Sequence, residues 1–362
     1  MQLRGAGLPG NHSDQEAVTR RSTRAPDAAC RIAVADPALR ARVISRAPLL
    51  YAGGADAALD RPAHVRAASS LAMVGGRLAI IQDDANFIAV LDPSDGRIES
   101  ITLPAGARGE RQFDDRRGNK RFKLDLEASV VAVDEGRTTL FAFGSGSSAA
   151  RERIAIVSGW DSDAISIELV AAPALYRALR EAPAFAGSEL NLEGAALMGD
   201  ELWLFGRGNG AQRGDFRPLN ATCVLRWPDV RAHLRSPETS APPVPARMTR
   251  YDLGVLGAIG LGFTDAIAVG TAFLYSAAAE DSPDAVTDGP VEGSCLGVIP
   301  HDGPIRWAPL MDASGQLFVG KVEGIAWPTP ACDRLSAVLD HDEPGTPSEL
   351  CIIALEGPWF GS

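Results

Sequence analysis

Glu323-Gly324-Ile325-Ala326-Trp327 is one copy of a short pattern that occurs five times along this chain. Each copy opens with a small or acidic pair of residues and continues as an apolar run, which is typical of a strand. A turn, a second apolar strand and a polar cluster follow every copy. The other copies occupy residues 69–73, 127–131, 193–197 and 264–268. The pattern therefore indicates a repeated unit of β-sheet.

The spacing of the copies favours one repetitive domain. Successive copies begin 58, 66, 71 and 59 residues apart. Propeller blades repeat every 40 to 50 residues or so, with about four strands in each. The longer intervals here leave room for extended loops. We therefore predict an all-β fold, a five-bladed β-propeller, while a six-bladed ring stays open because residues 30–66 could hold a degenerate blade.

The last repeat is one strand short, because the chain ends after the predicted strands 325–327, 335–339 and 350–355. The segment 41–50 can supply the missing outer strand, which would close the ring and leave no large unpaired edge. Residues 30–362 then form a single propeller domain. Residues 1–29, rich in Arg, Ser, Pro and Gly, are predicted to be disordered. Outside them, only 173–180 has a helical pattern.

Composition excludes some classes of partner. The formal net charge of -11 argues against nucleic-acid binding and against an anionic membrane surface. No stretch approaches the roughly 20 apolar residues that span a bilayer. Five cysteines with no CxxC pair are expected to be buried thiols, as in a reducing compartment. We therefore expect a cytoplasmic protein, or a periplasmic one if the true start of translation differs.

The predicted long loops share one face of the ring. Loops that enter a blade and loops between its second and third strands lie on the same side, and loops commonly carry function. They are 104–126, 171–192, 206–221, 254–263, 277–294 and 340–349. The opposite side receives short turns, apart from the Pro- and Ser-rich insert 235–246.

This face should be acidic near the axis. Glu127, Glu193 and Glu323 open their inner strands, and Asp265 stands one place beyond the matching position. Acidic residues also close the neighbouring strands, among them Asp83, Asp84, Glu280, Asp281, Asp340 and Asp342. The candidate ligand-binding residues are Glu127, Glu193, Asp265, Glu323, Lys123, Arg207, Asn209, Glu280, Lys321 and Arg153.

Crowded carboxylates repel one another unless something neutralises them. A hard cation such as Ca²⁺, which takes about 6 to 8 oxygen ligands, is one answer, with Glu127, Glu193 and Glu323 as the metal ligands. Internal ion pairs with Lys123, Arg153, Arg207 and Lys321 are another. A third interpretation is structural, since an acidic residue at a strand start can accept backbone N–H bonds.

Several motifs resemble those of uncharacterised bacterial β-propellers. The segments 126–128, 192–195 and 321–326 are similar to the "EGIA"-type strands of phytase-like and esterase-like propellers. The run 276–281 with Asp288-Gly289, and Ser145-Gly146-Ser147 followed by Arg151 and Arg153, resemble the uncharacterised group. The resemblance implies a polar central funnel and, in some relatives, calcium. Ser69 and Thr264 stand where the pattern elsewhere has Glu, a departure from a phytase-type site.

Three functional hypotheses follow. The first is a propeller that binds a small ligand or cation at an acidic funnel. The second is a calcium-assisted hydrolase of phosphoesters or esters, in which Lys123, Arg151 or Arg207 holds the anionic group. The third is a scaffold whose long loops contact a protein partner. The first is favoured because no GxSxG, HExxH or P-loop motif is present.

Overall fold

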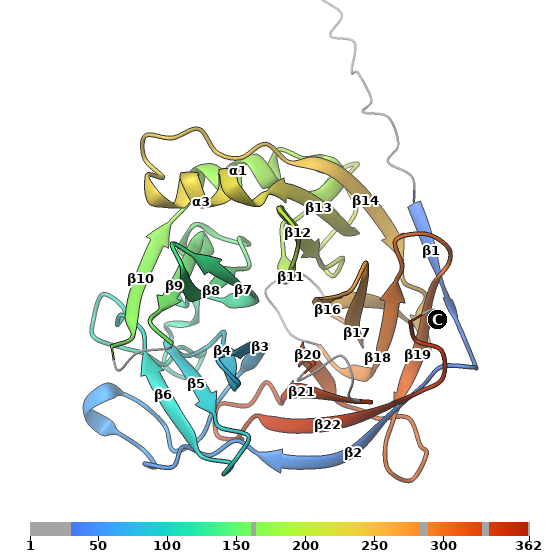
Figure 1. Cartoon of the computed structure of the whole chain (residues 1–362), viewed down its shortest axis with the longest axis horizontal. Coiled ribbons are helices and arrows are strands. Elements are labelled where there is room, and N and C mark those ends of the chain that lie inside the picture. The colour runs from blue at the N-terminus through green and yellow to red at the C-terminus, as the bar shows by residue number, and fades with distance from the viewer. Residues whose placement is uncertain (1–29, 161–163, 283–288, 328–332, 361–362) are drawn as a thin grey trace, which may run out of the picture.

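The computed structural model describes residues 30–160, 164–282, 289–327 and 333–360. Strands dominate this part of the chain, and Figure 1 shows them as small sheets around a common centre, a propeller-like arrangement. The segment predicted to be disordered, residues 1–29, lies outside the described residues. None of the described helices is long and apolar enough to cross a membrane.

Consecutive strands pair antiparallel in groups of four. The first group is β3 (Ala68–Val74), β4 (Arg77–Gln82), β5 (Phe87–Leu91) and β6 (Ile98–Thr102). The second is β7 (Leu126–Asp134), β8 (Arg137–Gly144), β9 (Arg153–Ser158) and β10 (Ser166–Ala171). The third is β11 (Leu192–Met198), β12 (Glu201–Gly206), β13 (Asn220–Arg226) and β14 (Ala246–Asp252).

The fourth group follows a two-residue strand, β15 (Val255–Leu256), that pairs with its first member. It is β16 (Ile259–Val269), β17 (Ala272–Glu280), β18 (Val291–Ile299) and β19 (Ile305–Met311). The last group is β20 (Lys321–Ala326), β21 (Arg334–Asp340), β22 (Glu349–Glu356) and β2 (Arg40–Pro48). The innermost strands touch in a cycle, because β3 contacts β7, β7 contacts β11, β11 contacts β16, β16 contacts β20 and β20 contacts β3.

The N-terminal strands join three of these groups. β2 pairs antiparallel with β22, as predicted for this segment, and it also meets the end of β19 in parallel. β1 (Cys30–Ala35), which the sequence pattern does not predict, pairs in parallel first with β14 and then with β19. Together they link the third, fourth and last groups into one 14-stranded sheet.

Three α-helices lie among the strands. The predicted helix is confirmed as α1 (Pro173–Arg180), and α2 (Pro183–Ala186) follows it. α3 (Trp227–Arg235) corrects the prediction that 173–180 is the only helical segment after residue 29. Pro228 lies in its first turn, where the missing N–H costs nothing. Trp227, Val230 and Leu234 are buried at helical spacing and pack into the core.

The loops on the predicted long-loop side carry short 3₁₀ turns. They are η2 (Lys120–Phe122) and η3 (Ala149–Arg151), while η1 (Ala57–Leu59) lies before the first group. Part of the predicted loop 277–294 is sheet instead, because β17 extends to Glu280 and β18 begins at Val291. This extension carries Glu280 to the neighbourhood of the axis, where it contacts basic side chains.

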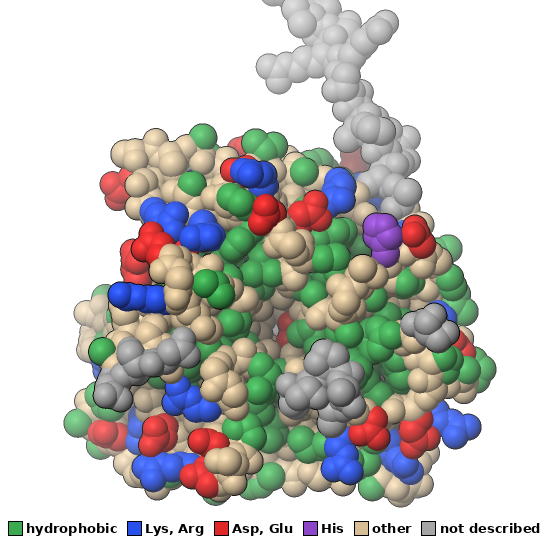
Figure 2. All heavy atoms as spheres, in the orientation of Figure 1, with side chains coloured by type: hydrophobic (Ala, Val, Ile, Leu, Met, Phe, Trp, Pro, Cys, Tyr) green, Lys and Arg blue, Asp and Glu red, His purple; other side chains and the backbone are tan. Residues whose placement is uncertain are grey.

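The innermost strands surround an apolar pocket at the end of the axis opposite the predicted acidic face. Leu71, Val131, Leu197, Ile267 and Trp327 help to line a pocket of about 300 Å³ formed by all the innermost strands. Figure 2 shows hydrophobic side chains gathered around the hollow at the centre of the view. Polar residues therefore gather at the starts of the innermost strands and apolar residues near their ends.

The cysteines follow the prediction with one exception. Cys223, Cys295 and Cys351 are buried free thiols. Cys30 is exposed at the start of β1, and Cys332 lies outside the described residues.

Two glycines allow the innermost strands to approach closely. A Cβ atom on Gly324 would lie 2.7 Å from the backbone nitrogen of Leu71 in β3. One on Gly194 would lie 3.0 Å from the backbone nitrogen of Ala266 in β16. Backbone atoms cannot move aside as a flexible side chain can, so glycine at these positions follows from the tight packing around the axis.

Replacing Gly324 with alanine should destabilise the fold. The added methyl group must push β3 and β20 apart, and overpacking of this kind costs about 1–3 kcal/mol. Urea unfolding measures the loss. Gly260→Ala is the matched control, because no atom lies within 4 Å of its added Cβ. Equal midpoints for Gly324→Ala and the unsubstituted protein would contradict the close-packing argument.

Candidate functional site

Each innermost strand carries a β-bulge at the same place in the repeat. The register of pairing with the second strand shifts across a single residue in β3, β7, β11, β16 and β20. The skipped residues are Ser69, Glu127, Glu193, Thr264 and Glu323. A bulge leaves one residue out of the ladder and re-aims its side chain. Four of these side chains line a cavity at the axis.

This axial cavity is small and almost wholly polar. Its volume is about 50 Å³, room for a few water-sized groups. It is lined by Ala67, Ala68, Ser69, Asp83, Lys123, Asp125, Glu127, Arg151, Asn191, Glu193, Arg207, Asn209, Lys321, Glu323, Asp340 and Asp342.

The structure brings most of the predicted site residues together in this cavity. They are Lys123, Glu127, Glu193, Arg207, Asn209, Lys321 and Glu323. Asn209 accepts a hydrogen bond from the Asn191 amide at 3.2 Å. Three predicted residues, Asp265, Glu280 and Arg153, do not line it.

Asp265 has a structural role. It follows the bulged Thr264, so its side chain does not point where the prediction placed it. Its carboxylate accepts backbone N–H bonds from Ile325 at 2.9 Å and from Ala266 at 2.7 Å. The first of these bonds reaches the neighbouring innermost strand β20. Asp265 therefore fastens two groups of strands together.

Glu280 lies outside the cavity and contacts two of the basic residues that line it. Its carboxylate contacts Arg207 at 2.6 Å and Lys321 at 3.2 Å, and it accepts a bond from the Gly289 N–H. Arg153 is the first residue of β9 and its side chain does not line the cavity. Arg151, two residues earlier, does so and is 4% exposed.

Asp125 and Asn191 are among the lining residues that are missing from the predicted site. Each stands two positions before a bulged glutamate, as the correctly predicted Lys321 does before Glu323. Residues two apart lie on the same side of an extended chain. The repeat therefore contained the information needed to find them, because the position two residues before each bulged glutamate lies on the same side of the strand.

The first cluster of charges centres on Lys123, which is 5% exposed. Its ammonium nitrogen lies 2.7 Å from Asp125 Oδ1 and 2.9 Å from Asp84 Oδ1, and it also donates to Asp83. Arg151 contacts the other oxygen of Asp125 at 3.0 Å. Both basic groups are thus paired with carboxylates.

The second cluster centres on Arg207 and Lys321. Arg207 contacts Glu193 at 3.5 Å in addition to Glu280. Lys321 contacts Glu323 at 2.7 Å and Asp342 at 3.8 Å. Every basic side chain of the cavity is therefore paired with at least one carboxylate.

The carboxylates outnumber the basic groups. Seven carboxylates and four basic side chains line the cavity, an excess of three negative charges if all are ionised. Glu127 makes no hydrogen bond or ion pair with any residue in the described part of the chain. One oxygen of Glu323, a side chain buried at the cavity wall, has no hydrogen-bond partner among those residues either.

This imbalance raises the pKa values of several carboxyl groups. Burial, then the charges of Asp83, Asp125 and Glu193, hold the pKa of Glu127 well above its usual range. Burial and the neighbouring Asp84 raise the pKa of Asp83 to about 7. Burial and Glu323 raise the pKa of Glu193 to about 8, although Arg207 acts against them.

Two carboxyl groups beside the basic residues behave in the opposite way. Burial acts to raise the pKa of Glu280, but Arg207 and Lys321 outweigh it and lower the pKa to about 2. Lys123 and Arg151 likewise lower the pKa of Asp125 despite its burial. The cavity thus holds some carboxylates firmly ionised and others that prefer a proton.

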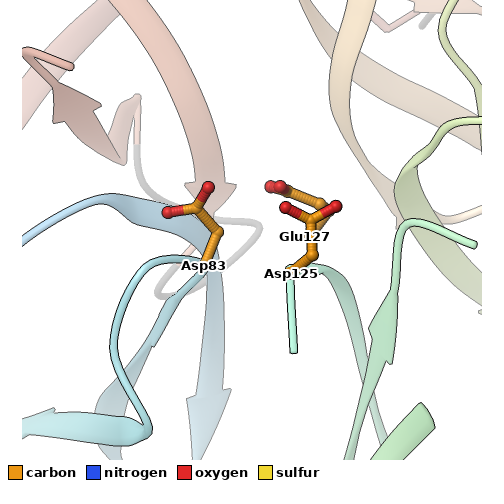
Figure 3. Close-up of side chains that lie close together, drawn as sticks. All are labelled: Asp83, Asp125 and Glu127. Carbon is orange, nitrogen blue, oxygen red and sulfur yellow. The ribbon is translucent and has the colours of Figure 1, made fainter. Parts of the chain in front are cut away.

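One group of carboxylates has the spacing of metal ligands. One oxygen each from Asp83, Asp125 and Glu127, the acidic triad, lie within 4.8 Å of one another. Figure 3 shows Asp83 facing Asp125 and Glu127 across the gap between β4 and β7. The set predicted to bind metal, Glu127, Glu193 and Glu323, lines the same cavity but shares only Glu127 with the triad.

A wider vestibule adjoins the cavity. It has a volume of about 210 Å³ and shares Asp83, Lys123, Asp340 and Asp342 with the cavity. Arg116 and Glu343 lie on its wall and pair at 2.8 Å, joining two loops far apart in the sequence. His341, between Asp340 and Asp342, lines neither space and lies 3.6 Å from Glu349.

Comparison with known proteins places the chain in a family. Residues 64–355 match the family described as "Family of unknown function (DUF6929)". The chain belongs to this family. The resemblance to a family without an assigned activity is thereby confirmed, and the likeness to phytase-like and esterase-like propellers stays a prediction. No curated protein matches the chain.

Solved structures with a similar shape are distant in sequence. They include a glutaminyl cyclase from Myxococcus xanthus, 11% identical, covering 88% of this chain and 97% of that chain with a TM-score of 0.41. A PQQ-bound aldose sugar dehydrogenase from Streptomyces coelicolor is 12% identical, with 89% and 100% coverage and a TM-score of 0.37. An α-L-arabinofuranosidase from Podospora anserina is 11% identical, with 89% and 98% coverage and a TM-score of 0.40. At these scores they carry no argument about function.

The raised pKa values predict that stability falls as pH rises. Asp83 and Glu193, with pKa values of about 7 and about 8, keep their protons in the folded state at pH values where an unfolded carboxyl group has lost its own. The folded protein then binds more protons than the unfolded chain, so the free energy of unfolding decreases with pH. The decrease should run from about pH 4, where unfolded carboxyl groups titrate, to about pH 8.

Urea unfolding in a chelating buffer between pH 5.5 and pH 8.5 measures this slope. Glu193→Gln cannot lose a proton and should flatten the slope. Glu168→Gln, on the exposed side of β10, should leave it unchanged. Stability that increases over this range in the unsubstituted protein would show that the cavity carboxyl groups are ionised throughout.

Proposed function

We propose that the chain folds as a five-bladed propeller, a single domain over residues 30–362, with β2 as the outer strand of the last blade. The cycle of contacts among β3, β7, β11, β16 and β20 supports five blades around one axis. The pairing of β2 with β22 supports closure by the N-terminal segment. On this basis the axial cavity is the central funnel predicted from the repeats.

We further propose that this funnel binds a small cation. The observation that carries the proposal is the excess of three carboxylates over basic groups around a cavity of about 50 Å³. Crowded carboxylates repel one another, and the uptake of protons or of a cation would relieve this repulsion. The raised pKa values describe the first of these states. A cation would displace those protons, as metal ions do when they bind protonated ligands.

The charge arrangement favours a cation over an anionic substrate. An anion needs basic groups that are available to it, and Lys123, Arg151, Arg207 and Lys321 already contact carboxylates. A phosphate group would also meet the surplus negative charge. The phosphoesterase hypothesis therefore has less support than simple binding.

Glu127, Glu193 and Glu323, the axial carboxylates, are the residues we propose as ligands. Glu127 has no partner among the described side chains, and Glu323 keeps one oxygen without a partner. Oxygen atoms are the ligands that Ca²⁺ prefers, so Ca²⁺ is the first cation to test. The vestibule gives it a path through Asp83, Asp340 and Asp342.

Thermal melting tests the proposal. A ligand that binds only the folded state stabilises it by about 2.7 kcal/mol at one hundred times its Kd. The melting temperature should therefore be higher with Ca²⁺ than with EDTA. Glu127→Gln and Glu193→Gln should reduce this increase, and Glu168→Gln should retain it.

Equal melting temperatures in EDTA, Ca²⁺, Mg²⁺ and K⁺ would contradict cation binding. Turnover of a generic phosphoester that disappears in Glu193→Gln would instead favour the hydrolase hypothesis.

A further inference from the structure

The acidic triad is already in contact with a positive charge. Asp83 follows β4, Asp125 precedes β7 and Glu127 is the bulged residue of β7, so two neighbouring groups of strands supply its members. Lys123 enters the same space from the chain before β7. Its ammonium nitrogen contacts both Asp83 and Asp125, the latter at 2.7 Å.

A metal ion and this ammonium group cannot both use the two oxygens that Lys123 contacts. Ca²⁺ binds oxygen ligands at about 2.3 to 2.6 Å, so an ion shared by Asp83 Oδ2 and Asp125 Oδ1 would overlap the Lys123 nitrogen. Lys123 is also fixed in place. It is buried, and it contacts a third carboxylate, Asp84, which lies outside the triad.

We propose that Lys123 is the resident cation of the acidic triad and determines where an exogenous cation can bind. Its ammonium group excludes divalent ions from the position between Asp83 and Asp125. Glu127 is the triad member that Lys123 leaves without an ion pair. An added cation is therefore confined to the side of the cavity where Glu127 faces the other axial carboxylates.

Replacing Lys123 with methionine tests this role. Methionine keeps an unbranched side chain of similar length and removes the charge, which opens the triad. Mn²⁺ titration followed by electron paramagnetic resonance counts bound ions per chain. We expect Lys123→Met to bind one Mn²⁺ more than the unsubstituted protein, and Asp83→Asn added to Lys123→Met should abolish the extra ion.

Lys321→Met is the matched control. It also removes one buried ammonium group from the cavity, but Lys321 contacts Glu280, Glu323 and Asp342 and no member of the triad. We therefore expect Lys321→Met not to bind the additional Mn²⁺ ion that Lys123→Met binds through Asp83. An equal gain in Lys321→Met that persists after Asp83→Asn would show that charge alone attracts the metal, and would overturn the proposal.

Lys123→Met leaves four surplus carboxylates where three stood, which could prevent folding. Lys123→Met with Asp84→Asn restores the original net charge and leaves the triad intact. The same extra Mn²⁺ is expected there, and its absence from this double variant would refute the inference. The number of ions in the unsubstituted protein tests the axial site separately, because Lys123 is expected to change the count by one whether that number is zero or one.

Discussion

The surplus of carboxylates around the axial cavity is the constraint on which the rest of this structure depends. Each innermost strand carries a bulge, four of the bulged side chains line the axial cavity, and three of these are glutamates. Carboxylates brought so close together raise one another's energy unless compensated. Four basic residues provide most of the compensation, and each of them contacts at least one carboxylate.

The cavity is asymmetric although the repeats are similar. Ser69 replaces glutamate in the first group and donates its hydroxyl to the Leu126 carbonyl of the next. Thr264 replaces it in the fourth and donates to Ser276. Gly262 stands where other repeats have Asp125 or Lys321, and a Cβ there would lie 3.0 Å from the Arg207 side chain. The Arg207 side chain therefore occupies the space that a side chain at position 262 of the fourth repeat would otherwise fill.

Much of this arrangement follows from the sequence, and the exceptions have identifiable causes. The recurring cassette predicts the innermost strands, the outer strand β2 and most of the basic and acidic lining. Asp265 was assigned to the cavity because a one-residue bulge cannot be read from apolar alternation. Asp125 was missed because it precedes the apolar run that marks the strand. α3 was missed because its first residues continue the β-like run of β13.

Polarity along the axis also has a physical basis. The starts of the innermost strands must bend toward the centre to place their bulged residues, and only polar or small side chains meet there. The later residues of the same strands, such as Val131 and Leu197, surround an apolar pocket instead. A charged species would therefore be desolvated at one end of the axis and excluded from the other.

The pairing of β2 with β22 has a consequence for biosynthesis. β2 leaves the ribosome among the first strands, yet its antiparallel partner comprises residues 349–356, near the end of the chain. Contacts between residues so distant in sequence form late, because the intervening chain must first be ordered. The last sheet can therefore be completed only after residues 349–356 have been synthesised. Until then β21 and β2 lack β22, the strand with which both of them pair, and the nascent chain would depend on protection from aggregation.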